Sequence, residues 1–190
     1  LLFLSGKDMD HFFAPTSLAL YGLSSKAHNT LRIMAENCLL WGFRGRLFGI
    51  NPVGDETDVH GIRMYRSASD LPVIPDLVAI LIPARFVPQA VEECGRAGIK
   101  RLAILSGGFN ESSDQGISLA DQVVHLAHRH GIRFVGPNGL TLADTTSGLC
   151  LPFVPCFPVR PGGFRSAAVV RPSSSRSPAT QRVGGLRVRT

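Results

Sequence analysis

Small and polar residues follow directly after the first short apolar run of the sequence. The segment Gly22-Leu23-Ser24-Ser25-Lys26 offers two hydroxyl groups, one ammonium group and a glycine that lets backbone N–H groups approach a ligand closely. If the segment opens a helix, the free N–H groups and the dipole at that helix N-terminus favour phosphate. We therefore predict a phosphate-binding turn. The alternative is a plain strand-to-helix turn in which Ser24 or Ser25 caps the helix.

Four more turns of this kind follow later apolar runs. In an open parallel sheet the carboxyl ends of the strands share one edge, and ligands bind there near a reversal in strand order. We therefore expect the turns to form one binding site. The predicted ligand-binding residues are Gly22, Leu23, Ser24, Ser25, Lys26, Asn51, Pro52, Ile82, Pro83, Ala84, Ser106, Gly107, Gly108 and Asn138.

The apolar pattern between these turns indicates an α/β fold. Short runs rich in β-formers alternate with longer stretches whose apolar residues recur at three- and four-residue spacing. The run over residues 77–82 is apolar throughout, as in a central strand buried on both faces. We predict a Rossmann-like, doubly wound parallel sheet of about five strands in residues 12–155. The expected strands lie at 17–21, 47–50, 77–82, 102–105 and 132–135, with a short one near 62–65.

A site for a nicotinamide dinucleotide is the first alternative to consider for these turns. Its fingerprint is Gly-x-Gly-x-x-Gly after the first strand, with an acid at the end of the second strand for a ribose hydroxyl. Here Gly22 is the one glycine of that set, and the second expected strand ends in Asn51-Pro52. An NAD(P)-binding oxidoreductase domain is therefore the second choice.

A longer series of short motifs carries a resemblance to a known family. Its members are Gly22-x-Ser24, Gly42-Phe43-x-Gly45, Asn51-Pro52, Gly61-x-x-x-Tyr65, Ser67-x-x-Asp70-Leu71-Pro72, Asp76-Leu77-Val78-x-Ile80-x-Ile82-Pro83, Ala97-Gly98-Ile99-Lys100, Ser106-Gly107-Gly108-Phe109-x-Glu111 and His130-Gly131-Ile132-Arg133-x-x-Gly136-Pro137-Asn138. In order and spacing the series resembles the coenzyme A-binding domain of NDP-forming acyl-CoA synthetases. That family includes ADP-forming acetate–CoA ligases, succinyl-CoA synthetase α subunits and related protein lysine acetyltransferases.

The resemblance implies coenzyme A or an acyl-CoA as the ligand. It places Gly22, Leu23, Ser24 and Lys26 along the phosphates and pantetheine, and the 82–84 segment beside the nucleotide part. It also places Ser106, Gly107 and Asn138 near the thiol. A coenzyme A-sensing part of a lysine acetyltransferase is a further alternative within the same resemblance.

Three of the motifs depart from the family's pattern. Val53 stands where the family often has a lysine that contacts phosphate, and Leu23 replaces a smaller residue, which would add bulk beside the ligand. Gly139, Leu140 and Thr141 replace the usual Cys, apolar residue and Gly after Gly-Pro-Asn. These changes bear on affinity and acyl specificity rather than on the fold.

The resemblance also implies domains that are not in these residues. In the family a phosphohistidine domain handles the acyl phosphate and an ATP-grasp domain binds nucleotide. We therefore expect no catalytic residue here, and we expect those ligase and ATP-grasp domains or subunits as partners. Acetylation by a lysine acetyltransferase would likewise need a separate catalytic domain.

Residues 156–190 differ in composition from the rest. They hold seven Arg and no acid, and they show neither a helix nor a strand period, so we expect a disordered tail. Our hypothesis is a frameshifted or truncated start of the next domain, because a GC-rich gene gives such Arg/Ser/Pro-rich sequence in the wrong frame. A natural basic tail is the alternative, and resequencing the gene distinguishes the two.

Charge and composition bear on the partners and the cellular location to be expected. Residues 1–155 hold 13 basic and 14 acidic residues, a net charge of −1, so we expect no nucleic-acid partner. The apolar start is four residues long, far short of a membrane span, and the four scattered cysteines indicate a reducing compartment. We expect a cytoplasmic protein.

His125, His128 and His130 lie close together, but without a further ligand we expect exposed imidazoles and no metal site.

Overall fold

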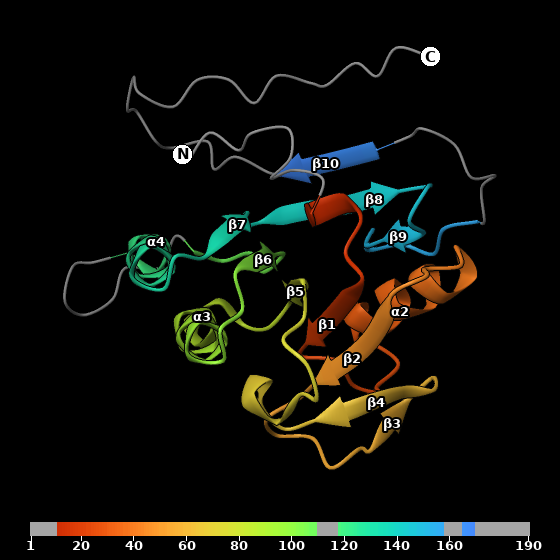
Figure 1. Cartoon of the computed structure of the whole chain (residues 1–190), viewed down its shortest axis with the longest axis horizontal. Helices are drawn as coiled ribbons and strands as arrows, with labels where there is room; N and C mark the ends of the chain where they lie inside the picture. Colours follow the sequence, from red (N-terminus) through yellow and green to blue (C-terminus); the bar gives the residue numbers. More distant parts are fainter. Residues whose placement is uncertain (1–10, 110–117, 158–164, 170–190) are drawn as a thin grey trace.

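The computed structural model describes residues 11–109, 118–157 and 165–169. Its centre is a seven-stranded sheet in the order β3-β4-β2-β1-β5-β6-β7 (Figure 1). Neighbouring strands run parallel, except β3 and β4. The strands are β1 (Ser17–Tyr21), β2 (Arg46–Ile50), β3 (Asp58–Val59), β4 (Ile62–Tyr65), β5 (Leu77–Ile80), β6 (Arg101–Ile104) and β7 (Arg133–Val135).

The strand order reverses at β1. From β1 the chain moves outward through β2 and β4, and it then returns to pair β5 with the other side of β1. This is the order of a doubly wound Rossmann-like sheet, in which the reversal opens a crevice at the carboxyl ends. The predicted fold class is confirmed.

The sheet has seven strands where we predicted about five. The extra edge strand, β3, is two residues long and reaches β4 through a tight turn at His60 and Gly61, whose φ angles are 56° and 78°. A hairpin this short leaves no two-residue alternation that sequence analysis can detect.

Helices cover both faces of the sheet. Helix α2 (Thr30–Leu40) lies on one face, and α3 (Val87–Arg96) and α4 (Leu119–Arg129) lie on the other (Figure 1). Successive side chains of β1 alternate between these layers: Leu18 and Leu20 pack in the α2 core, while Ala19 and Tyr21 pack in the α3–α4 core. This alternation explains why β1 is buried along its whole length.

A second, three-stranded antiparallel sheet follows in the order β10-β8-β9. Its strands are β8 (Gly139–Asp144), β9 (Leu149–Cys150) and β10 (Arg165–Val169). The expectation that no strand forms after residue 155 is therefore wrong for residues 165–169. Pairing with β8, far away in sequence, imposes the extended form on β10, and Arg165 Nε lies 3.6 Å from the buried Asp144 Oδ2. The rest of the predicted disordered tail, apart from 156–157, lies outside the described residues.

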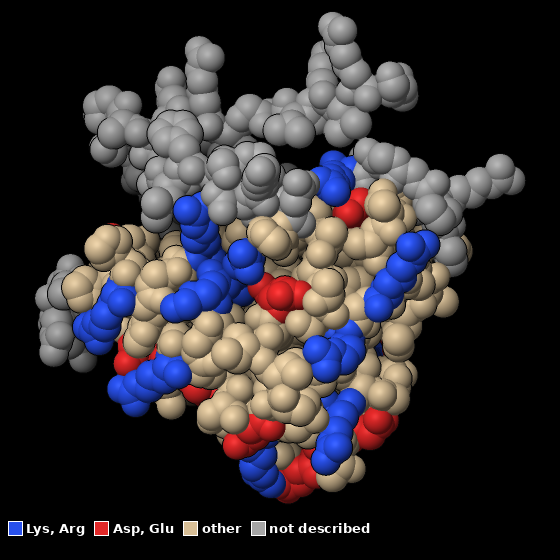
Figure 2. Space-filling view, viewed as in Figure 1, with Lys and Arg blue, Asp and Glu red and all other residues tan. Residues whose placement is uncertain are grey.

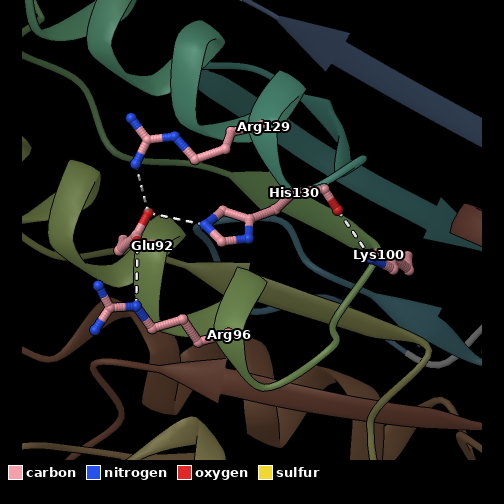
Figure 3. A network of polar contacts seen from close by, with 5 residues as sticks. All are labelled: Glu92, Arg96, Lys100, Arg129 and His130. Atoms are coloured by element: carbon pink, nitrogen blue, oxygen red, sulfur yellow. Dashed lines mark hydrogen bonds and ion pairs between the residues drawn. The ribbon is translucent and has the colours of Figure 1, made fainter.

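Polar contacts centred on Glu92 join α3 to α4 (Figure 3). One carboxylate oxygen accepts from Arg96 Nε at 2.9 Å, and the other lies 2.8 Å from His130 Nε2 and 3.8 Å from Arg129. Lys100 Nζ donates to the His130 carbonyl at 2.8 Å. The imidazole of His130 therefore couples the two helices.

His130 fits there because Gly95 has no side chain. A Cβ at Gly95 would lie 2.8 Å from His130 Cβ and closer still to its ring. The predicted exposure of the three histidines is confirmed for His125 and His128 and is wrong for His130, whose side chain is 18% exposed. Its burial depends on helix α3, which sequence spacing within α4 does not reveal.

Replacing Gly95 with alanine is expected to change stability in opposite directions in two backgrounds. In the wild type, Gly95→Ala should destabilise the fold by about 1–3 kcal/mol, because the methyl group overlaps His130. In a His130→Gly background, which removes the Cβ as well as the ring, the same change should stabilise the fold by roughly 0.5–1 kcal/mol, because alanine favours the helix. Urea unfolding of the four proteins measures both values. The same sign in both backgrounds would contradict this packing.

The stability that Glu92 contributes is expected to depend on pH. The hydrogen bond with His130, followed by that with Arg96, lowers the pKa of Glu92 below its ordinary value of 4.5. A carboxyl group whose pKa falls on folding stabilises the protein above the unfolded value, and that stability is lost as the pH falls through the folded value. The stability difference between wild type and His130→Ala should therefore shrink below about pH 4.5. Urea unfolding from pH 3 to pH 6 tests this, with His128→Ala as the control.

Candidate functional site

The turn after β1 fits tightly against the end of β5. Gly22 has a φ of 104°, and a Cβ there would lie 2.6 Å from Ile82 Cγ2 and 2.8 Å from the Leu81 carbonyl oxygen. The Gly22 N–H donates to the Ile50 carbonyl at 2.7 Å, and the Leu81 N–H donates to the Tyr21 carbonyl at 3.2 Å. The turn is therefore fixed at the reversal of strand order, where the ends of β1, β2 and β5 meet.

The side chains of this turn divide into two kinds. Leu23 is fully buried in the α2 core and Ser24 is nearly so, while Ser25 and Lys26 are exposed. The expectation that Leu23 adds bulk beside a ligand is wrong, because its side chain packs inward towards Gly49. An approaching ligand would meet the side chains of Ser25 and Lys26.

Asn29 connects the turn to helix α2. Its side-chain oxygen accepts from the Arg32 N–H at 3.1 Å, which caps the helix, and its amide nitrogen donates to the Gly22 carbonyl at 2.9 Å. The helix begins only at Thr30, so the segment 22–26 does not open it, and the alternative of a cap at Ser24 or Ser25 is wrong. Asn29 was not predicted, although an Asn directly before the helical pattern is an ordinary capping signal.

Asn51 links the loop after β2 to the same turn. Its side-chain nitrogen donates to the Leu23 carbonyl at 3.0 Å, and its oxygen accepts from the Val53 N–H at 3.2 Å. The side chain of Val53 is 89% exposed. The predicted residues Asn51 and Pro52 thus lie next to the predicted turn.

Glu56 contacts the turn directly and was missed by the sequence analysis. The Ser25 N–H donates to Glu56 Oε1 at 3.0 Å, and the Ser25 hydroxyl donates to the same oxygen. An acid that binds a ribose is expected at the end of the second strand. Glu56 lies six residues beyond Ile50, and no spacing rule marks it.

The other predicted residues meet around Ser106, at the ends of β5, β6 and β7. The buried Ser106 hydroxyl accepts from the Ile82 N–H at 3.1 Å, and its carbonyl accepts from the Asn138 N–H at 2.9 Å. Asn138 Oδ1 lies 3.1 Å from the position of a Cβ on Gly107. Gly108 similarly lies beside Ala84, which begins the short helix η2 (Ala84–Phe86).

All the predicted segments therefore lie at the same end of the sheet, where the parallel strands have their carboxyl ends. The Gly22–Ile82 contact joins the half around Ser25 to the half around Ser106. Together they offer backbone N–H groups, hydroxyls, two side-chain amides and the Lys26 ammonium group. This chemistry suits a ligand that carries phosphates at one end and an extended polar chain at the other.

Tyr21 is the last residue of β1, and its side chain lies on the face of the sheet that α3 and α4 cover. Its hydroxyl donates to Glu93 Oε2 at 2.7 Å, and Glu93 Oε1 accepts from the Ala68 N–H at 2.6 Å. Burial, followed by the hydrogen bond with Glu93, raises the pKa of Tyr21 above its ordinary value of 10.0. The neutral phenol therefore links the end of β1 to helix α3.

A surface depression of about 380 Å³ lies elsewhere, between α3 and the short helix η1 (Ala68–Asp70). It is lined by Ser69, Gln89, Glu92, Glu93, Arg96 and Ala97, none of which is a predicted ligand-binding residue. Its volume alone is a weaker indication of a site than the meeting of strand-end turns at the reversal of strand order.

On the face shown in Figure 2, Lys and Arg side chains lie among Asp and Glu side chains. Within the described residues no helix is long and apolar enough to cross a bilayer. In the same part of the chain, no group of three or more His, Cys, Asp or Glu side chains is arranged to hold a metal ion.

Known proteins resemble this chain over most of its length. Residues 16–144 match the profile of a family described as CoA binding domain. Subunit alpha of the ADP-forming acetate–CoA ligase I of Pyrococcus furiosus is 33% identical over 149 residues, which is 77% of this chain and 32% of that protein. The ADP-forming acetate–CoA ligase II of Archaeoglobus fulgidus is 32% identical over 154 residues, or 81% of this chain and 22% of that protein.

Solved structures agree. Acetyl-coenzyme A synthetase 1 of Candidatus Korarchaeum cryptofilum superposes with a TM-score of 0.70 at 30% identity, covering 78% of this chain and 31% of that one. This chain thus spans about a third or less of the length of these curated relatives. The match to the family profile covers every strand of the parallel sheet and its carboxyl-end turns, and the chain belongs to the CoA-binding domain family.

Proposed function

We propose that this chain binds coenzyme A or an acyl-CoA at the carboxyl ends of its parallel strands. The phosphates lie on the Gly22–Lys26 turn, the nucleotide part lies beside Ile82, Pro83 and Ala84, and the thiol end lies near Ser106 and Asn138. The observation that carries the proposal is the convergence of these turns at the strand reversal, in a chain of the CoA-binding domain family.

The larger role proposed is that of the coenzyme A-binding part of an NDP-forming acyl-CoA synthetase. Relatives that extend well beyond this chain are named ADP-forming acetate–CoA ligases. In such an enzyme this domain holds the thiol in position, while separate phosphohistidine and ATP-grasp domains carry the phosphoryl group and the nucleotide. This chain alone then binds its ligand without turnover, and its place of action is the cytoplasm.

Calorimetric titration of the chain with CoA and, separately, with NAD tests the proposal. Saturable binding of CoA and no binding of NAD are expected, since the glycine fingerprint for a dinucleotide is incomplete. Binding of NAD without CoA would instead favour an oxidoreductase domain. A folded chain that binds neither ligand would refute the proposed function for this chain.

Lys26 is expected to contribute to affinity through its charge. Lys26→Ala should weaken CoA binding by roughly five- to tenfold, because an exposed contact to phosphate is worth about 1 kcal/mol. Lys100→Ala is a matched control. Lys100 is also exposed, but it directly precedes β6 and therefore lies at the amino ends of the strands, away from the candidate site. Equal losses in the two variants would show only a general effect of charge.

Gly22 is expected to be required for the site because of its close approach to β5. Gly22→Ala should abolish detectable CoA binding and destabilise the fold by about 1–3 kcal/mol, since both the contact and the positive φ penalise a side chain. Gly61→Ala is the control, because Gly61 also has a positive φ, of 78°, but a Cβ there would have no atom within 4 Å. Urea unfolding and calorimetry separate the two effects. Unchanged binding in Gly22→Ala would contradict the proposed position of the ligand.

A further inference from the structure

Glu56 occupies the part of the turn to which an anion would bind. Its Oε1 accepts from both the backbone N–H and the hydroxyl of Ser25. A pair of donors converging on one oxygen is the arrangement by which turns of this kind hold a phosphate oxygen. The carboxylate of the chain itself therefore stands in for a ligand oxygen.

The second oxygen of this carboxylate is poorly compensated. Glu56 Oε2 is buried and has no hydrogen-bond partner within the part of the chain that the structure describes. A buried carboxylate oxygen without a partner costs free energy, because it has lost its hydration. Release of Glu56 into water recovers that hydration, and the Ser25 contact is therefore one that a competing anion can replace.

The neighbouring acid, Asp55, does not contact the predicted phosphate turn as Glu56 does. Asp55 directs its carboxylate to Arg66, with Oδ1 2.6 Å from the guanidinium, and the Asp55 side chain is 92% exposed. Two adjacent acids of one loop thus have different roles: one forms a surface ion pair, and the other lies on the predicted phosphate turn. Asp55 provides a control of equal charge in almost the same place.

Resting on the proposed function, we propose that Glu56 is a specificity-determining residue that fills the anion position at Ser25 and leaves when a phosphate ester binds. A ligand held by that single contact gains little from replacing the carboxylate. A ligand that also contacts the β5 and β6 ends, as CoA is proposed to do, has further interactions that compensate for the displacement. Glu56 thereby favours extended phosphate esters over simple anions.

The test is calorimetric titration of the full chain with CoA and with pantetheine, which lacks the phosphates. Glu56→Gln removes the charge and keeps the size, and it should bind CoA about tenfold more tightly than the wild type, because no charged acceptor has to be displaced. Glu56→Ala removes the acceptor as well and should bind CoA at least as tightly. Asp55→Asn loses the same charge and should stay within about twofold of the wild type. Pantetheine affinity should be the same in all four proteins.

Each outcome decides one of the two proposals. CoA binding that is tighter than in the wild type, and that is tighter in the Glu56 variants alone, supports the role of Glu56. Unchanged or weaker CoA binding in both Glu56 variants overturns that role and leaves the binding of CoA standing. A gain of equal size in Asp55→Asn or with pantetheine also overturns it, since the cause would then be overall charge or loop opening. Failure of every variant to bind CoA, with thermal unfolding showing intact folds, refutes the proposed function itself.

Discussion

The close approach of Gly22 to the end of β5 is the constraint on which the rest of the site depends. No other residue type fits between Ile82 and the Leu81 carbonyl at the observed φ of 104°. Because the turn lies this close, the loop after β1 reaches across to the Ser106 half of the site. A side chain at position 22 would separate the two halves of the carboxyl-end surface.

Side-chain amides and hydroxyls hold the remaining loops in place. Where the chain leaves the sheet, backbone groups lose their ladder partners and need others. Asn29 and Asn51 supply them for the carbonyls of Gly22 and Leu23, and Ser106 does so for the Ile82 N–H. Glu56 is the charged member of this set, and it accepts from the backbone N–H of Ser25 on the predicted phosphate turn. Under the proposal for Glu56, the candidate site combines permanent contacts with one that a ligand replaces.

The α3–α4 contact and the candidate site lie in different parts of the sheet: the contact lies over one face, and the site lies at the carboxyl ends of the strands. The α3–α4 contact rests on Gly95, His130 and Glu92, and Tyr21 is bonded to Glu93 on that same side. None of these residues lies among the strand-end turns that form the candidate site. Changes to the helix pair are therefore separable from changes to the ligand surface, which is useful when variants are interpreted.

The sequence by itself determined the fold class and the family and indicated the segments of the candidate site, because apolar periodicity and turn residues are local properties. Residues 77–82 indicated a buried strand, and the Gly, Pro and Asn turns marked the carboxyl ends correctly. Tertiary structure alone decided the direction of Leu23, the partner of His130, the strand at 165–169 and the contact of Glu56 with Ser25. Each of these depends on a neighbour from another element, and spacing along the chain carries no information about which element that is. The two-residue strand β3 was missed for a related reason, since a pattern so short has no period to read.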